Sequence, residues 1–345
     1  MNRIHQMLLR IKLSKPYSAS SNALAICLLV TLLSCSNHYN SDGDLANSSA
    51  IDGNSLSDLD DASISTLINE PLTLDNKPNI VPEGMVFVPG GTTTIGSDSG
   101  MPSEQPEFKV VVEPFFMDSH PVTVGDFRNF VEDTGYVTFS DSIGDGVVFD
   151  FENASWIIKD GVNWEYPLGV DYGKAPDDHP VTLLTYNDAI NYLSWAGKRL
   201  PTEIEWEHAA RGLTNRNDRY AWGNSLKENG EFMTNTWNGT FPTSNNVEDG
   251  HLTTAPVGVY AKNDLGLSDM GGNVWEWTSS WFRSYENRNK PYTITQDSEK
   301  VLRGGSFMCH SSYCHGYRVS ARSNTPPDNN MFHVGFRGVK SIDLN

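Results

Sequence analysis

Two cysteines near the C-terminus are the residues whose types and spacing are best suited to chemistry. Cys309 and Cys314 are separated by His310-Ser311-Ser312-Tyr313. Two thiols five positions apart can face each other across a tight loop. Such a pair can form a disulfide in an oxidising compartment, a two-thiolate site for a soft ion such as Cu(I), or a redox-active dithiol, and the spacing leaves these three alternatives open. A structural zinc site is disfavoured, because no second cysteine pair or matching histidine pair completes four ligands.

Two other stretches carry oxygen atoms suited to a hard cation such as Ca²⁺. One is the glycine turn and apolar run 271–277, where Asp269 and Glu276 supply carboxylates. The other is a loop with Asn235 and Asp249. Because Asn and Asp are ordinary turn residues, and because tryptophans after a glycine turn are typical of a core strand, the purely structural interpretation of both stretches also stays open.

The histidines and the known nucleophile motifs add no further candidate. We interpret six scattered histidines as structural or exposed: His120, His179, His208, His251, His315 and His333. The sequence has no H-x-x-x-H or H-x-E-x-H spacing, no G-x-S-x-G turn and no phosphate-binding loop of the G-x-x-x-x-G-K-[ST] type. A helical zinc or iron site, a serine hydrolase and a P-loop enzyme therefore lack support.

Short elements must position these residues. The apolar run 85–88 ending at Pro89-Gly90 predicts a strand and a turn. Three helices are expected, each opened by a threonine with an acid three positions later. The pairs are Thr123 with Asp126, Thr185 with Asp188, and Thr202 with Glu205, and the first helix is expected over 124–133. The remainder is predicted as short strands and loops.

Composition and charge set limits on the class of protein. The chain has 345 residues, 43 Asp plus Glu against 25 Lys plus Arg, and a formal net charge of −18. This acidic balance opposes nucleic-acid binding, which needs clustered basic residues. A hydrophobic content of 38% with 11% aromatics supports a packed core. We predict one domain over 84–345, preceded by a flexible acidic tether over 35–83 that is rich in Ser, Asn and Asp.

The N-terminus is typical of an export signal. Residues 1–34 contain four basic residues, no acid, and an apolar run too short to span a bilayer. Leu32-Leu33-Ser34-Cys35 resembles a bacterial lipobox, in which the cysteine is lipidated and becomes the new N-terminus. We therefore predict an exported lipoprotein, anchored at Cys35 in the outer membrane and facing the periplasm or the cell surface. A plain signal peptide is the alternative.

Taken together, the motifs of residues 85–339 resemble those of the formylglycine-generating enzyme family, also called sulfatase-modifying factors. The resemblance is carried by Met85-Val86-Phe87-Val88-Pro89-Gly90-Gly91, Ala196-Gly197-Lys198-Arg199-Leu200-Pro201-Thr202-Glu203, Gly272-Asn273-Val274-Trp275-Glu276-Trp277, Arg303-Gly304-Gly305-Ser306 and Gly335-Phe336-Arg337. It implies a mixed α+β, C-type-lectin-like fold with little regular secondary structure. Within this family the two cysteines specifically indicate the oxidase reaction, because non-catalytic relatives generally lack both.

The resemblance also implies a reaction. The family converts the cysteine of a C-x-P-x-R motif in an unfolded sulfatase into Cα-formylglycine, using O₂ and a thiol reductant. By resemblance, Cys309 and Cys314 are the copper ligands, holding Cu(I) as a bis-thiolate that the substrate thiolate joins. Ser306, Tyr313 and Trp275 match pocket positions that orient O₂ and the substrate sulfur.

Two structural Ca²⁺ sites are implied in the same way. One would use Asn235, Thr236, Asp249 and His251. The other would use Asp269, Gly272, Val274 and Glu276. Val319 and Gly338 stand where some members have cysteines, so those structural disulfides are not expected here. His333 stands where other members have Asn.

Two alternatives to the copper-dependent oxidase remain at this point. The first is a non-catalytic surface lipoprotein that uses the same fold for binding or assembly. The second is a relative with other oxidative or copper-handling chemistry. The cysteine pair favours the oxidase over the first alternative.

Overall fold

The fold is known here from a computed structural model, which describes residues 78, 80–214 and 217–342. The predicted signal peptide, most of the predicted tether and the predicted anchor Cys35 lie outside the described residues. The α-helices are α3 (Val124–Thr134), α4 (Phe139–Ile143), α5 (Tyr186–Trp195) and α6 (Glu203–Arg211). Short 3₁₀ turns occur at η1 (Pro102–Glu104), η2 (Val170–Tyr172) and η3 (Tyr285–Asn287).

Most strands are short, and many of them form two-stranded sheets. The strands are β1 (Met85–Val88), β2 (Gly91–Ile95), β3 (Phe108–Val112), β4 (Phe115–Asp118), β5 (Asp145–Asp150), β6 (Ser155–Asp160), β7 (Lys227–Glu228), β8 (Glu231–Phe232), β9 (Gly239–Thr240), β10 (Ser244–Asn245), β11 (Trp275–Trp281), β12 (Lys300–Arg303), β13 (Ser323–Thr325), β14 (Val334–Gly335) and β15 (Val339–Ser341). Hairpins join β2 to β3, β5 to β6, β7 to β8 and β9 to β10. This confirms the expected mixed α+β fold with little regular structure.

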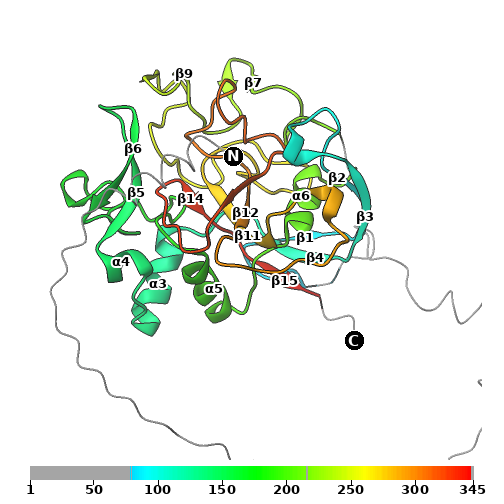
Figure 1. Cartoon of the computed structure of the whole chain (residues 1–345), viewed down its shortest axis with the longest axis horizontal. Coiled ribbons are helices and arrows are strands. Elements are labelled where there is room, and N and C mark those ends of the chain that lie inside the picture. The colour runs from blue at the N-terminus through cyan, green and yellow to red at the C-terminus, as the bar shows by residue number, and fades with distance from the viewer. Residues whose placement is uncertain (1–77, 79, 215–216, 343–345) are drawn as a thin grey trace, which may run out of the picture. The chain divides into compact units, whose positions relative to one another are not determined.

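A four-stranded sheet in the order β13-β12-β11-β14 lies at the centre of the described part (Figure 1). β11 runs antiparallel to β12 and parallel to β14. The start of β11, the end of β12 and the start of β14 therefore meet at one end of the sheet. A second sheet, β1-β4-β15, brings the first strand of the domain beside the last one.

The three predicted helices are confirmed with their caps. Thr123, Thr185 and Thr202 each accept a hydrogen bond from the third backbone N–H of the helix, and the acid at that position reaches back to the cap. Such a cap typically contributes about 1 kcal/mol. α4 was not predicted, although Thr138 and Asp141 form the same capping box. Its five residues are too few to give a periodic apolar pattern.

Two buried ion pairs join α6 and the segment between β14 and β15 to the central sheet. Glu207 of α6 pairs with Arg303 of β12, and neither side chain is exposed. Glu276 of β11 pairs with Arg337 at equally complete burial. Because a buried charge is costly without a partner, each pair constrains where its two segments can lie.

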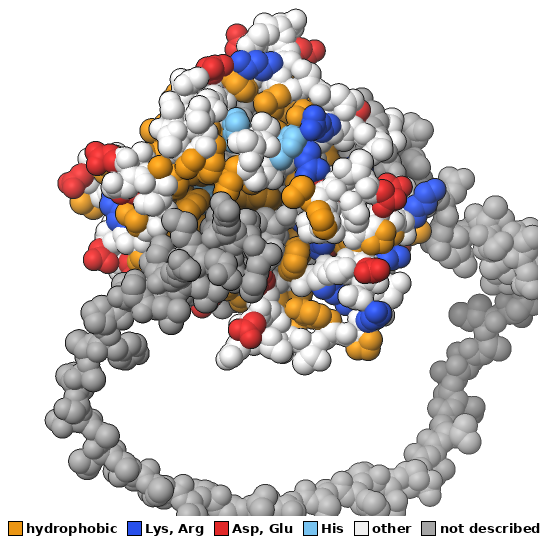
Figure 2. Space-filling model, turned by 45° about the horizontal axis from the view of Figure 1, so that its top comes forward, with side chains coloured by type: hydrophobic (Ala, Val, Ile, Leu, Met, Phe, Trp, Pro, Cys, Tyr) orange, Lys and Arg blue, Asp and Glu red, His pale blue; other side chains and the backbone are white. Residues whose placement is uncertain are grey.

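Figure 2 shows the charged and hydrophobic side chains on one face of the domain. On the face shown in Figure 2, Asp and Glu lie mostly towards the margin, while hydrophobic side chains gather in the upper central part beside two histidines. Within the described ranges, no helix has the length and apolar character needed to cross a bilayer.

Candidate active site

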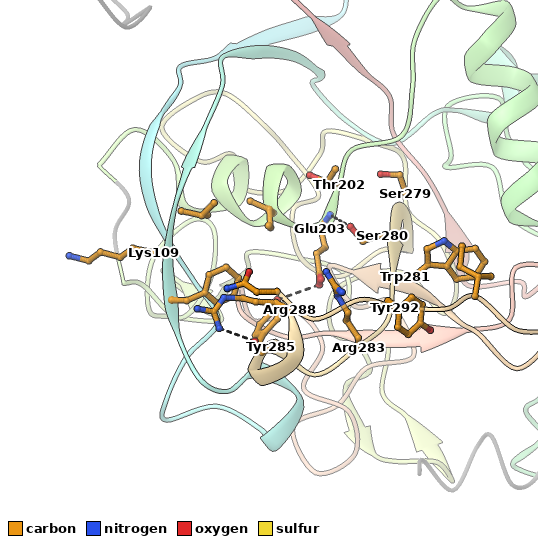
Figure 3. A pocket seen from close by; sticks show the side chains of 15 residues that line it. Lys109, Thr202, Glu203, Ser279, Ser280, Trp281, Arg283, Tyr285, Arg288 and Tyr292 are labelled. Carbon is orange, nitrogen blue, oxygen red and sulfur yellow. Dashed lines mark hydrogen bonds between the residues drawn. The ribbon is translucent and has the colours of Figure 1, made fainter.

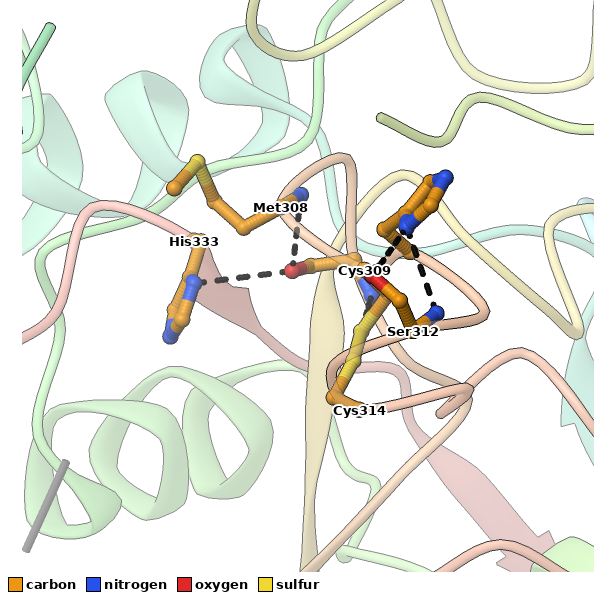
Figure 4. Close-up of a disulfide and its surroundings, with 7 residues drawn as sticks. Met308, Cys309, Ser312, Cys314 and His333 are labelled. Carbon is orange, nitrogen blue, oxygen red and sulfur yellow. Dashed lines mark hydrogen bonds between the residues drawn. A yellow bond between two sulfur atoms is a disulfide. The ribbon is translucent and has the colours of Figure 1, made fainter. Parts of the chain in front are cut away.

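Cys309 and Cys314 lie together in a tight loop beyond β12 and are joined by a disulfide (Figure 4). Their Cα atoms are 5.4 Å apart. The loop is closed by the backbone carbonyl of His310, which accepts from the N–H groups of Tyr313 and Cys314 at 2.9 and 3.1 Å. Cys309 is 1% exposed, whereas Cys314 is half-buried. The pair therefore presents one sulfur to the core and one towards the surface.

Ser306 is held on both sides. Its backbone N–H donates to Cys309 Sγ at 3.4 Å, and its hydroxyl oxygen accepts from the N–H of Met308 at 3.2 Å. The ring Nδ1 of His333 lies 3.5 Å from the same oxygen (Figure 4). Burial lowers the pKa of His333 to about 3, so its ring is neutral. With its proton on Nε2, the neutral ring accepts a hydrogen bond from the Ser306 hydroxyl through Nδ1 and orients that hydroxyl.

The residues of this site lie at or just beyond the ends of three neighbouring strands. Trp275 is the first residue of β11, Ser306 follows the end of β12 by three positions, and His333 directly precedes β14. The backbone N–H of Trp275 donates to the carbonyl of His333 at 2.9 Å. The sheet register therefore places a tryptophan, a hydroxyl and an imidazole around the buried cysteine.

Glycines let the chain approach itself closely here. A Cβ at Gly316 would lie 2.5 Å from the Trp275 ring and 3.0 Å from Cys309 Sγ. The indole and the sulfur therefore flank the same glycine. Gly305 has φ of 73°, and a Cβ there would come within 2.6 Å of the backbone of Gly316. Both positions need glycine for steric reasons.

Tyr313 lies at the edge of the site and is 36% exposed. Its ring stacks on Phe241 with centroids 4.3 Å apart, and Phe241 in turn contacts Trp237 at 5.2 Å. Burial raises the pKa of Tyr313 to about 12, so its phenol stays protonated at neutral pH. The rings make a half-exposed apolar surface next to Cys314.

The donor set fits a soft, low-coordinate ion. Two sulfurs converge, and no carboxylate or imidazole of the described residues joins them in a cluster of three or more such side chains. Two cysteines without carboxylate or imidazole ligands match Cu(I) better than zinc or calcium. A disulfide has no thiolate to offer, so the pair must first be reduced.

The first predicted calcium set fits a hard cation. Asn235 is fully buried, and its amide oxygen has no hydrogen-bond partner. The nearby carboxylate of Asp249 accepts from the backbone N–H groups of Thr236 at 2.8 Å and His251 at 3.3 Å. Burial raises the pKa of Asp249. A half-buried carboxylate beside a buried, unpaired amide oxygen is a donor arrangement that suits Ca²⁺.

The second predicted calcium set is arranged differently. The carboxylate of Glu276 accepts two hydrogen bonds from Arg337, both at 2.7 Å, and one from the Trp206 indole at 2.8 Å. Asp269 accepts from the N–H of Gly258 at 2.7 Å. The Glu276 charge is thus already balanced by a guanidinium, so the first set offers the better fit.

His333 and Phe241 belong to this site but were not singled out by their chemistry in the sequence. By chemistry alone His333 falls among the scattered structural histidines, and the family resemblance marks it as a position where other members have Asn. The sequence offers one further indication of its role. His333 directly precedes the run Val334-Gly335-Phe336-Arg337, and that run contains Arg337, which the structure shows to be buried. Phe241 carried no signal, because it meets Tyr313 only through the fold.

Comparison with known proteins places the chain within a family. A family model described as the sulfatase-modifying factor enzyme 1-like domain matches residues 72–342. The formylglycine-generating enzyme of Streptomyces coelicolor is 42% identical over 286 residues, covering 76% of this chain and 90% of that protein. The inactive Cα-formylglycine-generating enzyme 2 of Bos taurus is 37% identical over 274 residues, covering 73% and 86%.

A solved structure has the same fold. The structure of PvdO from Pseudomonas aeruginosa matches with a TM-score of 0.58 and 25% identity, covering 77% of this chain and 99% of that one. The similarity extends over nearly all the described residues. Since the relatives include both an active and an inactive protein, the residues of the site carry the argument about chemistry.

Proposed function

The chain belongs to the family of formylglycine-generating enzymes, and from this premise we propose that its Cys309–Cys314 pair, once reduced, is the centre at which a sulfatase cysteine is oxidised. The chain is an enzyme of sulfatase maturation, with a sulfatase polypeptide as its substrate. The observation that supports the assignment of the centre is the convergence of the two cysteines with Ser306 and Trp275 at one end of the central sheet.

Cys309 and Cys314 are the residues that would hold copper. Two thiols of a reductant open the disulfide and leave two cysteine thiols and an oxidised reductant. Cu(I) held by these two cysteines would supply a soft redox centre that prefers sulfur ligands. In the overall reaction, R–CH₂–SH, O₂, two electrons and two protons give R–CHO, H₂S and H₂O.

The protein's own side chains would prepare the substrate sulfur. The hydroxyl of Ser306, directed by His333, offers a polar group with fixed orientation close to Cys309. The indole of Trp275 covers the side of the site that faces the core and excludes water from it. Polar interactions inside the site are stronger when water is excluded. Tyr313 and Phe241 offer an apolar surface for the peptide residues that flank the substrate cysteine.

The first prediction is direct conversion of a peptide. The full mature chain, reduced and loaded with Cu(I), should convert a peptide with a C-x-P-x-R motif under O₂. The product should have lost one sulfur and two hydrogens and gained one oxygen, as read by mass spectrometry. An aldehyde-specific hydrazine reagent should then label it.

Two control peptides define the specificity. Replacing the peptide cysteine by serine should prevent conversion, because serine gives no thiolate. Replacing the arginine of the motif should weaken conversion without changing the chemistry. Failure of the properly loaded enzyme to convert the native motif would refute the proposed function.

We also propose that Ca²⁺ binds the set formed by Asn235, Thr236, Asp249 and His251. Binding to the folded state alone stabilises it by about 2.7 kcal/mol when calcium is at 100 times its Kd. Adding CaCl₂ to chelator-treated protein should therefore raise the midpoint of thermal unfolding. Asp249→Asn should remove this response, since it removes the only carboxylate of the set.

Glu248 provides the matched control for that test. It neighbours Asp249 but is exposed and pairs with Lys227 at 2.9 Å. Glu248→Gln should keep the full calcium response. An Asp249→Asn protein that responds to calcium like the unchanged protein would exclude this set as the site. The set with Asp269, Gly272, Val274 and Glu276 remains a prediction.

The proposed placement is that of an exported lipoprotein with a signal peptide over 1–34, a tether over 35–83 and the enzyme domain over 84–345. Support comes from the sequence of the first 35 residues. Cys35→Ala should release the protein from the membrane fraction and abolish its labelling by an alkyne-tagged fatty acid, because the lipid-bearing thiol is gone.

Cys27→Ala is the matched control, since Cys27 lies within the apolar run of the predicted signal and is expected to be removed with it. It should leave both membrane attachment and labelling intact. Equal membrane attachment and labelling of the Cys35→Ala protein would show that Cys35 is no lipid anchor.

A further inference from the structure

A cavity lies away from the cysteine pair. It has a volume of about 640 Å³ and opens between β3, the start of α6, the end of β11 and residues 283–294 (Figure 3). Ligand sites for small molecules typically have volumes of about 300–1,000 Å³. Its lining includes neither the cysteines nor Ser306, Tyr313 or Trp275.

Two arginines of the lining have no acidic partner. The guanidinium of Arg288 stacks over the ring of Phe108 at 4.4 Å and donates to the carbonyl of Tyr285 at 2.9 Å. Arg283 donates to the carbonyl of Lys290 at 3.0 Å. Neither forms an ion pair with a carboxylate of residues 78, 80–214 or 217–342. Each has five N–H donors, so most of them remain for a ligand.

A third unpaired cation lies behind the cavity wall. The ammonium of Lys300 is 3.8 Å from the ring centroid of Trp281 and donates to the carbonyl of Ser279 at 2.8 Å. It likewise forms no ion pair with an acid of the described part of the chain. Burial lowers its pKa to about 8, which still leaves most of it charged at neutral pH.

Glu203 supplies the acidic group of the lining, and it is already neutralised. Arg322 donates to its two carboxylate oxygens at 2.8 and 3.0 Å, and the Tyr285 hydroxyl approaches at 3.3 Å. The cavity is therefore cationic, although the whole chain carries a net charge of −18. A low-dielectric cleft with one sign of charge concentrates ions of the opposite sign.

The other walls are aromatic and hydroxylic. Phe108, Trp281 and Tyr292 provide ring surfaces, and Ser279 and Ser280 provide hydroxyl groups. We propose that this cavity binds a small organic oxyanion whose flat apolar body lies against the aromatic wall. The charged group, a carboxylate or a sulfate or phosphate ester, is held by Arg283 and Arg288, whose planar forks match such oxygens. This site is independent of the proposed oxidase function.

The test uses two probes of equal shape. The full mature chain is titrated by calorimetry with 4-nitrobenzoate and with the neutral 4-nitrobenzamide. The anion should bind at least about tenfold more tightly, which corresponds to about 1.4 kcal/mol. 4-Nitrophenyl sulfate and 4-nitrophenyl phosphate then rank the headgroups. Equal binding of the anion and the amide, or no binding of any anion, would overturn the proposal.

Variants locate the site. Arg283→Gln combined with Arg288→Gln should weaken 4-nitrobenzoate binding at least about tenfold. Lys109→Gln is the matched control, because the Lys109 amino group points away from the other labelled side chains in Figure 3. It should leave binding unchanged. If the double variant fails to fold, Arg288→Lys tests the planar fork alone and should still weaken binding. Unchanged affinity in the folded arginine variants, or an equal loss in Lys109→Gln, would contradict the assignment.

Discussion

Replacing either Cys309 or Cys314 by serine should reduce conversion of a C-x-P-x-R peptide by about 1,000-fold or more, the scale expected when a central catalytic group is removed. A serine hydroxyl is a hard, weakly acidic donor and offers no thiolate to a soft ion. The proposed centre would need both sulfurs, because either serine variant leaves a single thiolate to hold the ion. The measurement is the rate of aldehyde formation with reduced, Cu(I)-loaded protein.

Stability must be separated from chemistry in that comparison. A cross-link across so short a loop contributes about 2 kcal/mol in the chain-entropy model, so serine variants lose it when the native protein is oxidised. Measuring unfolding of all proteins in excess reductant removes this difference, since none is then cross-linked. The variants should match the native protein in stability there and still be inactive.

Ser311→Ala is the matched change within the same loop. Ser311 is exposed and belongs to no part of the proposed site, so its variant should keep native activity. If the cysteine pair served only as a local disulfide, the serine variants would keep activity in proportion to their folded fraction. That result would contradict the thiolate centre and favour the structural interpretation that the spacing alone had left open.

The parts of the fold that the sequence could predict are those decided by local chemistry. Thr123, Thr185 and Thr202 cap their helices through contacts with residues three positions away, so the pattern is complete within one helical turn. The strand 85–88 was predicted for the same reason, as a continuous apolar run followed by a turn. α4 shares the capping pattern but is one short turn, where no apolar period can confirm it.

The candidate site could be predicted where its residues lie close together in the sequence. Cys309, Cys314 and Ser306 lie within nine positions, so a single motif contains them. His333 is 27 positions from Ser306 and reaches it only because β14 lies beside β11 in parallel. A pairing of this kind depends on sheet register, which no local pattern in either segment specifies. The stacking of Phe241 on Tyr313 joins two loops that are far apart in the sequence, and no local pattern predicts it either.

The buried charged residues were the part of the fold that the sequence predicted least well. They also give the second prediction with a large expected effect. Glu207→Gln should lower the free energy of unfolding by about 3–5 kcal/mol, the usual cost of breaking a buried ion pair from one side. One oxygen of Glu207 accepts from Arg303 at 2.5 Å, and the other accepts from Arg211 at 2.6 Å and from the N–H of Gly96 at 2.9 Å. Glutamine would remove the buried negative charge that Arg303 and Arg211 share, and its amide group would present an N–H donor where a guanidinium needs an acceptor.

Denaturant unfolding of Glu207→Gln against the native protein measures this loss, with Glu248→Gln as the control. Glu248 and Lys227 form an exposed pair, whose removal should leave the unfolding midpoint unchanged because solvent screens such pairs. Arg303 directly precedes the Gly304-Gly305 turn that sets Ser306 beside Cys309, so the folded fraction of Glu207→Gln should also have a lowered kcat. Native stability in Glu207→Gln would show that this network does not hold α6 against the sheet, and native kcat would show that the turn is positioned without it.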